Sequence, residues 1–340
     1  ADGLTLLMAT APHRFREQVV SELRGVVSPE GVSPFWEAVG RHFFRMDFSE
    51  ADKLSATTDN QFILDLTPQH PIYVDLLPEA ARAVVRAGDR LSPARVGALA
   101  AAGLGTVNVY ARPVVALLST GDELVPPGSR LGPGQIIASN HLGVAALSEM
   151  AGAEPRLLGI ARDTRESLDA HLAQAADADV IVTIGGASVG DHDLVAPVLA
   201  ARGMALSFWK IAMRPGKPLM FATHGTQRIL GLPGNPVSAL ICARVFLVPL
   251  VRAMLGEPLE QAGPEPAITD VALEANGPRQ HYARATLASG PDGRLRVRPV
   301  RSQDSSLLSP LAEAGCLIVR PADAPAVPPG GEIRILRLDF

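Results

Sequence analysis

Hydrophobic and polar positions change their spacing repeatedly beyond residue 113, where short apolar runs alternate with segments of helical periodicity. The predicted strands are Val114–Leu118, Arg156–Ile160, Val180–Ile184, Leu206–Ile211, Leu219–Phe221 and Arg228–Gly231. The predicted helices are Asn140–Met150, Thr164–Ala176, Leu194–Ala201 and Pro236–Met254. This order predicts an α/β domain over residues 113–257, with an open, mostly parallel sheet and helices on both faces.

The flanking segments follow other patterns. Residues 1–86 hold most of the large aromatic side chains and show helical spacing, with Ser33-Pro34 as one predicted helix start. Residues 264–340 contain short apolar runs separated by Pro and Gly, which predicts a small C-terminal β domain. The composition changes near Val85–Gly88, where we place a boundary.

Composition and charge exclude several classes of protein. A net charge of −4 and a pI near 6.1 lack the basic excess of a nucleic-acid-binding protein. Apolar runs such as Pro113–Leu118 are too short to span a bilayer, and the first residues lack the charge pattern of a signal peptide. Cys242 and Cys316 lie in apolar surroundings and are predicted to be buried thiols. We therefore expect a cytoplasmic protein with no membrane and no nucleic-acid partner.

Four loops that follow predicted strands carry candidate chemistry, because open α/β sheets bind ligands at the carboxyl ends of their strands. The first loop supplies Thr120, Gly121, Asp122 and Glu123, and the second supplies Gly185, Gly186, Ser188, Gly190 and Asp193. Glycine-rich loops expose backbone N–H groups that cradle phosphate oxygens. Carboxylates are the ligands that Mg²⁺ prefers, so Glu123 and Asp193 are the candidate metal ligands. An exposed acidic turn and a tight turn with a helix cap remain the alternatives for these two loops.

The other two loops favour an anionic ligand. The third loop places Lys210, Arg214 and Lys217 within eight residues, and a solvated basic turn is the alternative. The fourth loop opens the last long helix, where a helix N-terminus favours negative charge. Its candidate binding residues are Pro233, Gly234, Asn235 and Ser238.

Taken together in this order, the motifs resemble the molybdopterin molybdenumtransferase family over about residues 88–340. The resemblance rests on Ser-Thr-Gly-Asp-Glu, Gly-Gly-x-Ser-x-Gly, Pro-Gly-Lys-Pro and Pro-Gly-Asn-Pro, together with Ser139-Asn140 and Ser305-Ser306-Leu307. It implies insertion of molybdate into adenylylated molybdopterin, release of AMP, a requirement for Mg²⁺ and a homodimer. It also implies catalytic roles for Glu123, Asp193 and Lys217, with the other loop residues and Ser139 and Asn140 binding molybdopterin.

The first 85 residues resemble a different family. The stretch from Ser33 to Phe44, followed by Gln61-Phe62-Ile63 and His70-Pro71-Ile72-Tyr73, is similar to an internal piece of arginine N-succinyltransferase. Residues 87–112 are then a remnant of the molybdenumtransferase N-terminal region. The family's Asp-Gly-Tyr-Ala segment is not found, since Leu4 follows Asp2-Gly3, and we expect this to impair turnover.

Three other functions are weighed against the enzyme. A non-catalytic molybdopterin-binding protein or scaffold is consistent with the missing segment. An amidohydrolase like the competence-damage-inducible proteins shares Gly121-Asp122-Glu123 and Gly185-Gly186, but it lacks the Pro-Gly-Lys-Pro loop. A succinyltransferase is disfavoured because the acyl-CoA-binding part of that family is absent from the resemblance.

Overall fold

The computed structural model describes residues 89–101, 107–186, 194–257 and 263–338. The chain divides into two compact units, Ala1–Tyr110 and Ala111–Phe340, so the division falls later than the composition change near Val85–Gly88. The helices predicted within residues 1–86 lie outside the described residues. In the first unit the structure describes helix α6 (Pro93–Ala101), which the sequence analysis did not predict. Helix α6 begins at a Ser-Pro pair, the same kind of start as predicted at Ser33-Pro34. Ser92 Oγ accepts from the backbone N–H of Arg95 at 3.3 Å.

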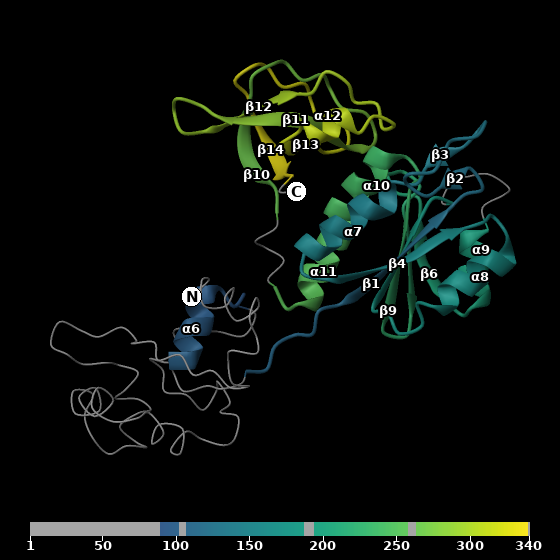
Figure 1. Ribbon diagram of the computed structural model, residues 1–340. Helices are drawn as coiled ribbons and strands as arrows, with labels where there is room; N and C mark the ends of the chain where they lie inside the picture. Colours follow the sequence, from purple (N-terminus) through teal and green to yellow (C-terminus); the bar gives the residue numbers. More distant parts are fainter. Residues whose placement is uncertain (1–88, 102–106, 187–193, 258–262, 339–340) are drawn as a thin grey trace, which may run out of the picture. The chain divides into compact units, whose positions relative to one another are not determined.

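A six-stranded sheet in the order β4-β1-β5-β9-β8-β6 forms the centre of the second unit (Figure 1). Its strands are β1 (Val114–Thr120), β4 (Glu154–Ala161), β5 (Val180–Ile184), β6 (Ala205–Trp209), β8 (Met220–His224) and β9 (Gln227–Leu232). The first four in the order pair in parallel, whereas β8 and β6 are antiparallel to their neighbours. Only Gly225 and Thr226 connect β8 to β9, and a two-residue connection allows only a hairpin. The predicted open, mostly parallel α/β sheet is confirmed.

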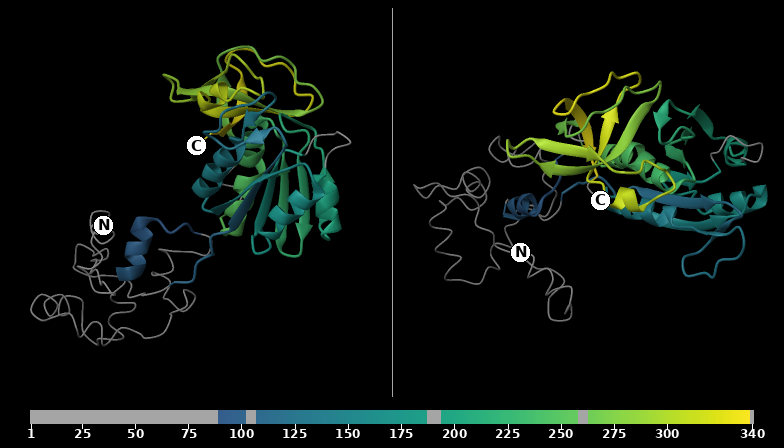
Figure 2. Two further views of the ribbon diagram at one scale, coloured as in Figure 1. Left: turned by 45° about the vertical axis from the view of Figure 1, so that its right-hand side comes forward. Right: turned by 90° about the horizontal axis from the view of Figure 1, so that it is seen from above.

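Helices cover both faces of this sheet (Figure 2). Helices α7 (Asn140–Met150), α10 (Pro236–Cys242) and α11 (Val248–Met254) pack on one face around Leu117, Val182 and Leu230. Helices α8 (Arg165–Ala173) and α9 (Val195–Ala201) pack on the other face around Leu118 and Ile229. Strands β1 and β5 are buried on both faces, which explains their continuous apolar sequence.

The last long helix is not regular throughout, unlike the single helix predicted. Residues Ala243–Leu247 form a π-helical turn, η4, between α10 and α11. Pro249 has no N–H group to bond the carbonyl of Val245, so the backbone must adjust one turn earlier. The continuous segment Pro236–Met254 is long and apolar enough to cross a membrane by length and composition, although Arg244 and Arg252 interrupt its apolar runs. Of its most apolar part, 56% is buried inside the structure, and the core helices of soluble proteins can be equally long and apolar.

The C-terminal β domain holds the basic loop of the α/β domain in place. Its strands are β10 (Glu265–Thr269), β11 (Gln280–Ser289), β12 (Leu295–Pro299), β13 (Cys316–Arg320) and β14 (Glu332–Arg337), with a short helix α12 (Ser309–Ala312). Strand β7 (Met213–Arg214), which comes from the third loop, pairs in parallel with β11. The loop that carries Arg214 and Lys217 is therefore fixed by hydrogen bonds to the β domain.

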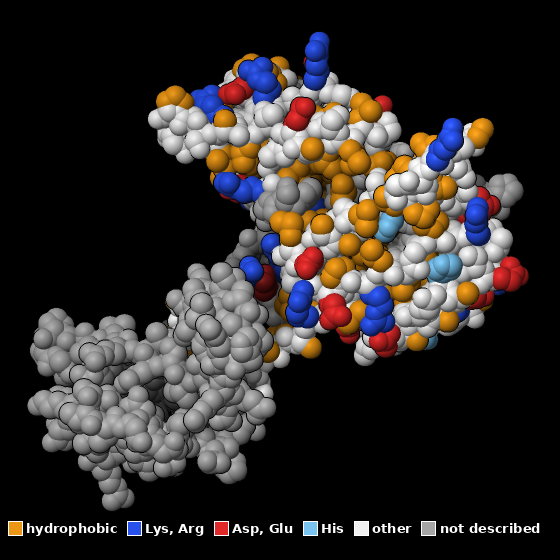
Figure 3. Space-filling view, viewed as in Figure 1, with side chains coloured by type: hydrophobic (Ala, Val, Ile, Leu, Met, Phe, Trp, Pro, Cys, Tyr) orange, Lys and Arg blue, Asp and Glu red, His pale blue; other side chains and the backbone are white. Residues whose placement is uncertain are grey.

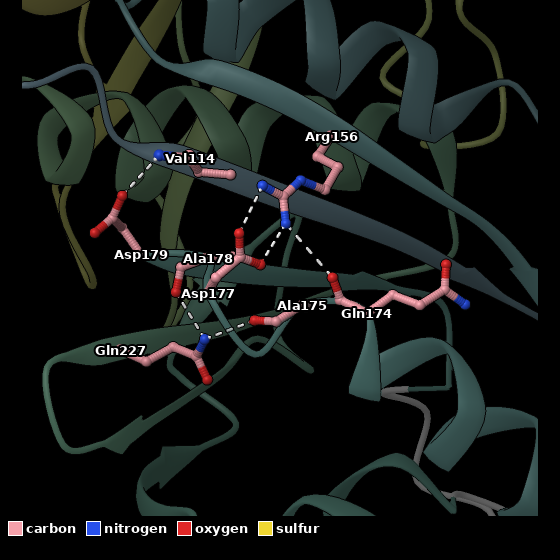
Figure 4. A network of polar contacts seen from close by, with 8 residues as sticks. All are labelled: Val114, Arg156, Gln174, Ala175, Asp177, Ala178, Asp179 and Gln227. Carbon is pink, nitrogen blue, oxygen red and sulfur yellow. Dashed lines mark hydrogen bonds and ion pairs between the residues drawn. The ribbon is translucent and has the colours of Figure 1, made fainter.

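A polar network ties the amino ends of the parallel strands together (Figure 4). Asp179 Oδ2 accepts from the backbone N–H of Val114 at 2.8 Å, and Arg156 makes a two-pronged contact with Asp177. Gln227 Nε2 donates to the carbonyls of Ala175 and Ala178 at 2.9 and 2.7 Å. These contacts are structural, and they leave the opposite, carboxyl edge of the sheet for the candidate site.

The face of the second unit seen in Figure 3 carries apolar side chains on its surface. Among the described residues, the exposed large apolar side chains include Leu142 and Met150 of α7, and Leu131 and Ile136 of the segment that holds β2 (Leu124–Val125) and β3 (Ile136–Ile137). Exposed apolar residues are ordinary on folded proteins, so we assign this face no role.

Candidate functional site

The first two loops meet at the carboxyl edge of the sheet. Gly185 and Gly186 follow β5 with φ of +97° and +62°, a backbone region that glycine enters without strain. A Cβ on Gly185 would lie 2.5 Å from the carbonyl oxygen of Thr120, at the end of β1. A Cβ on Gly186 would lie 2.6 Å from Cγ2 of Val195. Glycine is therefore required at both positions for β1, β5 and α9 to approach one another.

The hydroxyl of Thr120 lies beside these glycines. Thr120 is only 3% exposed, and its Oγ1 would be 2.9 Å from a Cβ on Gly186. Within the described residues this hydroxyl has no hydrogen-bond partner. A buried polar atom normally has a partner, so an unpaired one at the mouth of a candidate site is consistent with a ligand contact.

The fourth loop joins this edge to the β domain. Asn140, at the start of α7, donates through Nδ2 to the carbonyl of Gly234 at 2.7 Å. Asn235 Nδ2 lies 3.1 Å from Ser305 Oγ of the β domain, and the backbone N–H of Val237 donates to the carbonyl of Ser305 at 3.2 Å. The Pro-Gly-Asn-Pro segment therefore links the sheet edge to a second group of polar residues.

Three carboxylates lie near the first loop. The carboxylate of Glu123 folds over Gly121, because its Oε2 would be 2.6 Å from a Cβ there. Asp122 Oδ1 accepts from the backbone N–H of Asp163 at 3.3 Å. Burial, and then the charges of Asp122 and Glu123, raise the pKa of Asp163 above its ordinary value. In the part of the chain that the structure describes, however, no three such residues are arranged to hold a metal ion.

A cavity of about 380 Å³ lies where the basic loop meets the β domain. Its lining is mostly cationic and polar: Met213, Arg214, Pro215, Gly216, Lys217, Pro218, Ser238, Arg279, His281, Arg284, Gln303, Asp304 and Ser305. Of the predicted site residues, Arg214, Lys217 and Ser238 are brought together here. Lys210 does not line the cavity; its Nζ lies 4.6 Å from the centre of the Trp209 ring. Gly216 has φ of +109°, and a Cβ there would lie 2.4 Å from Cys242 Sγ.

Arg284 is held rigidly at this cavity. It is 1% exposed, and its guanidinium donates to the carbonyls of Leu307 and Asp304 at 3.2 and 3.0 Å. Burial lowers its pKa, although an arginine stays charged at neutral pH. The pKa of His281 falls to about 4, first because of burial and then because Arg214 and three other arginines lie nearby. The imidazole is therefore neutral at pH 7, surrounded by fixed positive charge.

Sequence reasoning missed the residues that the β domain contributes to the cavity, namely Arg279, His281, Arg284, Gln303 and Asp304. One signal was available. Arg284 lies between Ala283 and Ala285 in one of the short apolar runs of the C-terminal segment, and an arginine is rarely buried without a partner. The pairing of β7 with β11, which brings these residues to Lys217, has no local sequence signal.

The remaining predicted residues are distributed as follows. Thr120, Gly121, Gly185, Gly186, Asn140 and Gly234 gather at the sheet edge. Pro233 is buried, and Ser139 begins α7 without a capping hydrogen bond from its side chain. Ser188, Gly190 and Asp193 lie outside the described residues, so their placement stays a prediction.

An open α/β domain with a glycine-lined sheet edge, joined to a small β domain at a cavity lined by cationic and polar side chains, defines the class of this protein. Family models agree: residues 116–253 match the probable molybdopterin binding domain and residues 266–338 match the MoeA C-terminal region. Residues 3–109 match the arginine N-succinyltransferase beta subunit, in line with the resemblance of the N-terminal segment.

Similar whole proteins carry the same family name. The molybdopterin molybdenumtransferase of Nostoc sp. is 36% identical over 82% of this chain and 66% of its own length. That of Haemophilus influenzae is 35% identical over 69% of this chain and 59% of its own length. A molybdopterin biosynthesis MoeA protein of Pyrococcus horikoshii superposes with a TM-score of 0.65 at 29% identity, covering 76% of this chain and 62% of the other.

Over residues 116–338 the chain therefore belongs to the MoeA family of molybdopterin molybdenumtransferases. It spans about 59–66% of the length of these relatives. The family resemblance found in the sequence is confirmed.

Proposed function

We propose that this protein acts in molybdenum cofactor biosynthesis by inserting molybdate into adenylylated molybdopterin, with release of AMP. One observation carries the proposal: a cavity with four cationic side chains lies beside a glycine-lined sheet edge, and Ser305, which lines the cavity, is hydrogen-bonded to the loop that contacts this edge. The names of the similar proteins support the transfer of molybdenum to molybdopterin.

The cavity suits a tetrahedral oxyanion. Arg214, Lys217 and Arg284 supply positive charge and N–H donors, and Ser238 and Ser305 supply hydroxyl donors. Its volume of about 380 Å³ exceeds that of one small oxyanion and lies within the usual range for a small-molecule site. The cavity therefore has room for molybdate together with part of an organic ligand.

At the sheet edge, the proposed contacts are with the phosphate-bearing part of molybdopterin. The backbone N–H groups that follow Gly185 and the unpaired hydroxyl of Thr120 supply donors for phosphate oxygens. Ser188 and Gly190 extend this cradle in the proposal. The proposed role of Asn140 is to position the loop at Gly234, because its side-chain amide already donates to the carbonyl of that residue.

Glu123 and Asp193 are the proposed Mg²⁺ ligands. The fit is chemical: these are oxygen donors, and the charges of Asp122 and Glu123 add to the effect of burial in raising the pKa of Asp163, so a cation there would offset local negative charge. Mg²⁺ bound there would neutralise charge on the adenylyl phosphate. The chain's own contribution at Glu123 is to hold its carboxylate beside Gly121, at the end of β1.

The proposed reaction needs no covalent nucleophile from the chain. Burial raises the pKa of the Cys242 thiol to about 12, so this thiol stays protonated although it lies directly beneath Gly216. A protonated, buried thiol packs as a small apolar group.

Turnover with adenylylated molybdopterin and molybdate tests the proposal, with released AMP as the readout. The expected result is molybdate-dependent AMP release that Glu123→Gln reduces strongly. If the protein binds molybdopterin tightly but releases no AMP, the non-catalytic carrier is the correct function. If it binds neither molybdopterin nor molybdate, both functions are wrong.

A further inference from the structure

The cavity contains one side chain whose charge opposes that of its surroundings. Among the lining residues, all of which the structure describes, Asp304 is the only carboxylate. It lies among Arg214, Lys217, Arg279 and Arg284, so the cavity is positively charged and has a single negative side chain. A carboxylate does not help a cavity to attract anions. The place of Asp304 in the lining therefore points to a different role.

The carboxylate of Asp304 is fixed in place. Its Oδ1 accepts from the backbone N–H of Ser306 at 2.9 Å and from Ser306 Oγ at 2.8 Å. Its backbone carbonyl accepts from the guanidinium of the buried Arg284 at 3.0 Å. The side chain of Asp304 is exposed, and Oδ2 is the oxygen not used by Ser306.

The charge state of Asp304 is also set by these contacts. The two hydrogen bonds from Ser306, and to a smaller degree the charge of Arg284, lower the pKa of its carboxyl group. Asp304 is therefore ionised at neutral pH and below, and it can only accept hydrogen bonds.

We propose that Asp304 is a specificity-determining residue, which makes the cavity distinguish tetrahedral oxyanions by whether they carry a proton. An oxyanion with an O–H group, such as hydrogen phosphate, donates to Oδ2 of Asp304. A fully ionised oxyanion, such as sulfate or molybdate, has no donor and meets an unpaired negative charge. The inference rests on the proposed function only in that the cavity binds oxyanions.

A consequence follows for the cargo of the proposed reaction. Asp304 weakens the hold of the cavity on molybdate relative to a cavity lined only by donors. A moderate affinity is suitable for an anion that must leave the cavity for its acceptor, since an interaction made equally before and during transfer does not accelerate it.

The test compares sulfate with inorganic phosphate by calorimetric titration of the full chain at about pH 6, where phosphate groups retain a proton. Asp304→Asn keeps the oxygen that Ser306 contacts and replaces Oδ2 with an N–H donor. We expect the ratio of the sulfate to the phosphate dissociation constant to fall by about twofold to fivefold, because Asp304 is exposed and solvent screens its charge. The affinity for molybdate should rise together with the affinity for sulfate.

Two controls complete the experiment. Glu166→Gln removes the same charge from the exposed surface of α8, outside the cavity lining, and should leave the ratio unchanged. Ser306→Ala removes the hydroxyl that donates to Oδ1 of Asp304, so the carboxylate is held less firmly. The ratio should therefore fall, but by less than in Asp304→Asn. An unchanged ratio in Asp304→Asn, an equal change in Glu166→Gln, or no oxyanion binding by the parent protein would overturn the inference. Normal oxyanion selectivity without AMP release would instead refute the proposed function alone.

Discussion

Lys217 and Lys210 provide a matched pair of lysines from the same loop, and only one of them lines the cavity. Lys217 lies among the cationic residues there, whereas Lys210 rests over the ring of Trp209. If the cavity binds molybdate, Lys217→Ala should weaken binding and Lys210→Ala should not. The comparison therefore separates a specific contact from the general loss of one positive charge.

The magnitude follows from the contact and its surroundings. A hydrogen bond to a charged group contributes about 1.5–3 kcal/mol, which corresponds to roughly a tenfold to a hundredfold change in affinity. Lys217 is exposed and three arginines remain in the cavity, so we expect the lower end, about tenfold. Lys210→Ala should change affinity by less than about twofold, the usual scale of a screened surface charge.

Calorimetric titration of molybdate into both variants and the parent measures this difference at one ionic strength. Thermal unfolding of each variant checks that the loop and the β domain remain folded. Equal affinities for the parent and Lys217→Ala, or equal losses in both variants, would refute the assignment of molybdate to this cavity.

Three further predictions concern stability, which urea unfolding measures. Gly185→Ala should cost well over 2 kcal/mol, since the new Cβ meets the carbonyl of Thr120; Gly134→Ala, also at positive φ but in open space, should cost only about 1–2 kcal/mol. Similar costs would show that contact at the sheet edge is unimportant. Gln227→Ala should cost about 1–3 kcal/mol, because it removes two hydrogen bonds and takes the side-chain donor from the carbonyl of Ala178; no loss would contradict that role. The folded pKa of His281, about 4, lies below the unfolded value of 6.5. The stability that the neutral imidazole contributes is therefore lost as pH falls from about 6.5 to 4. His281→Gln should flatten this decline, and an unchanged slope would show that His281 does not titrate as described.

The parallel part of the sheet was accessible from the sequence because its signals are local. Strand β1 is buried on both faces and reads as an uninterrupted apolar run, and the same holds for β5. The carboxyl ends of adjacent parallel strands share one edge, so the proximity of Thr120 to Gly185 followed from the order of the strands.

The composition of the cavity was less accessible because it depends on pairing between distant segments. The third loop was identified from its charges, but nothing in its sequence shows that Met213–Arg214 forms a strand beside β11. That pairing selects Lys217 and not Lys210 as a lining residue, and it adds Arg284 and Asp304 from the β domain. The π-helical turn before Pro249 was partly predictable. The proline is visible in the sequence, but the sequence does not show that the helix accommodates it by a π-helical turn.

The central claim is that molybdate binds in the cavity between the basic loop and the β domain. A crystal structure of the full chain soaked with molybdate, with anomalous data collected at the molybdenum absorption edge, tests it most directly. The account predicts one dominant molybdenum peak within contact distance of Lys217, Arg284 and Ser305. A dominant peak elsewhere, or none in this cavity at saturating molybdate, would contradict it.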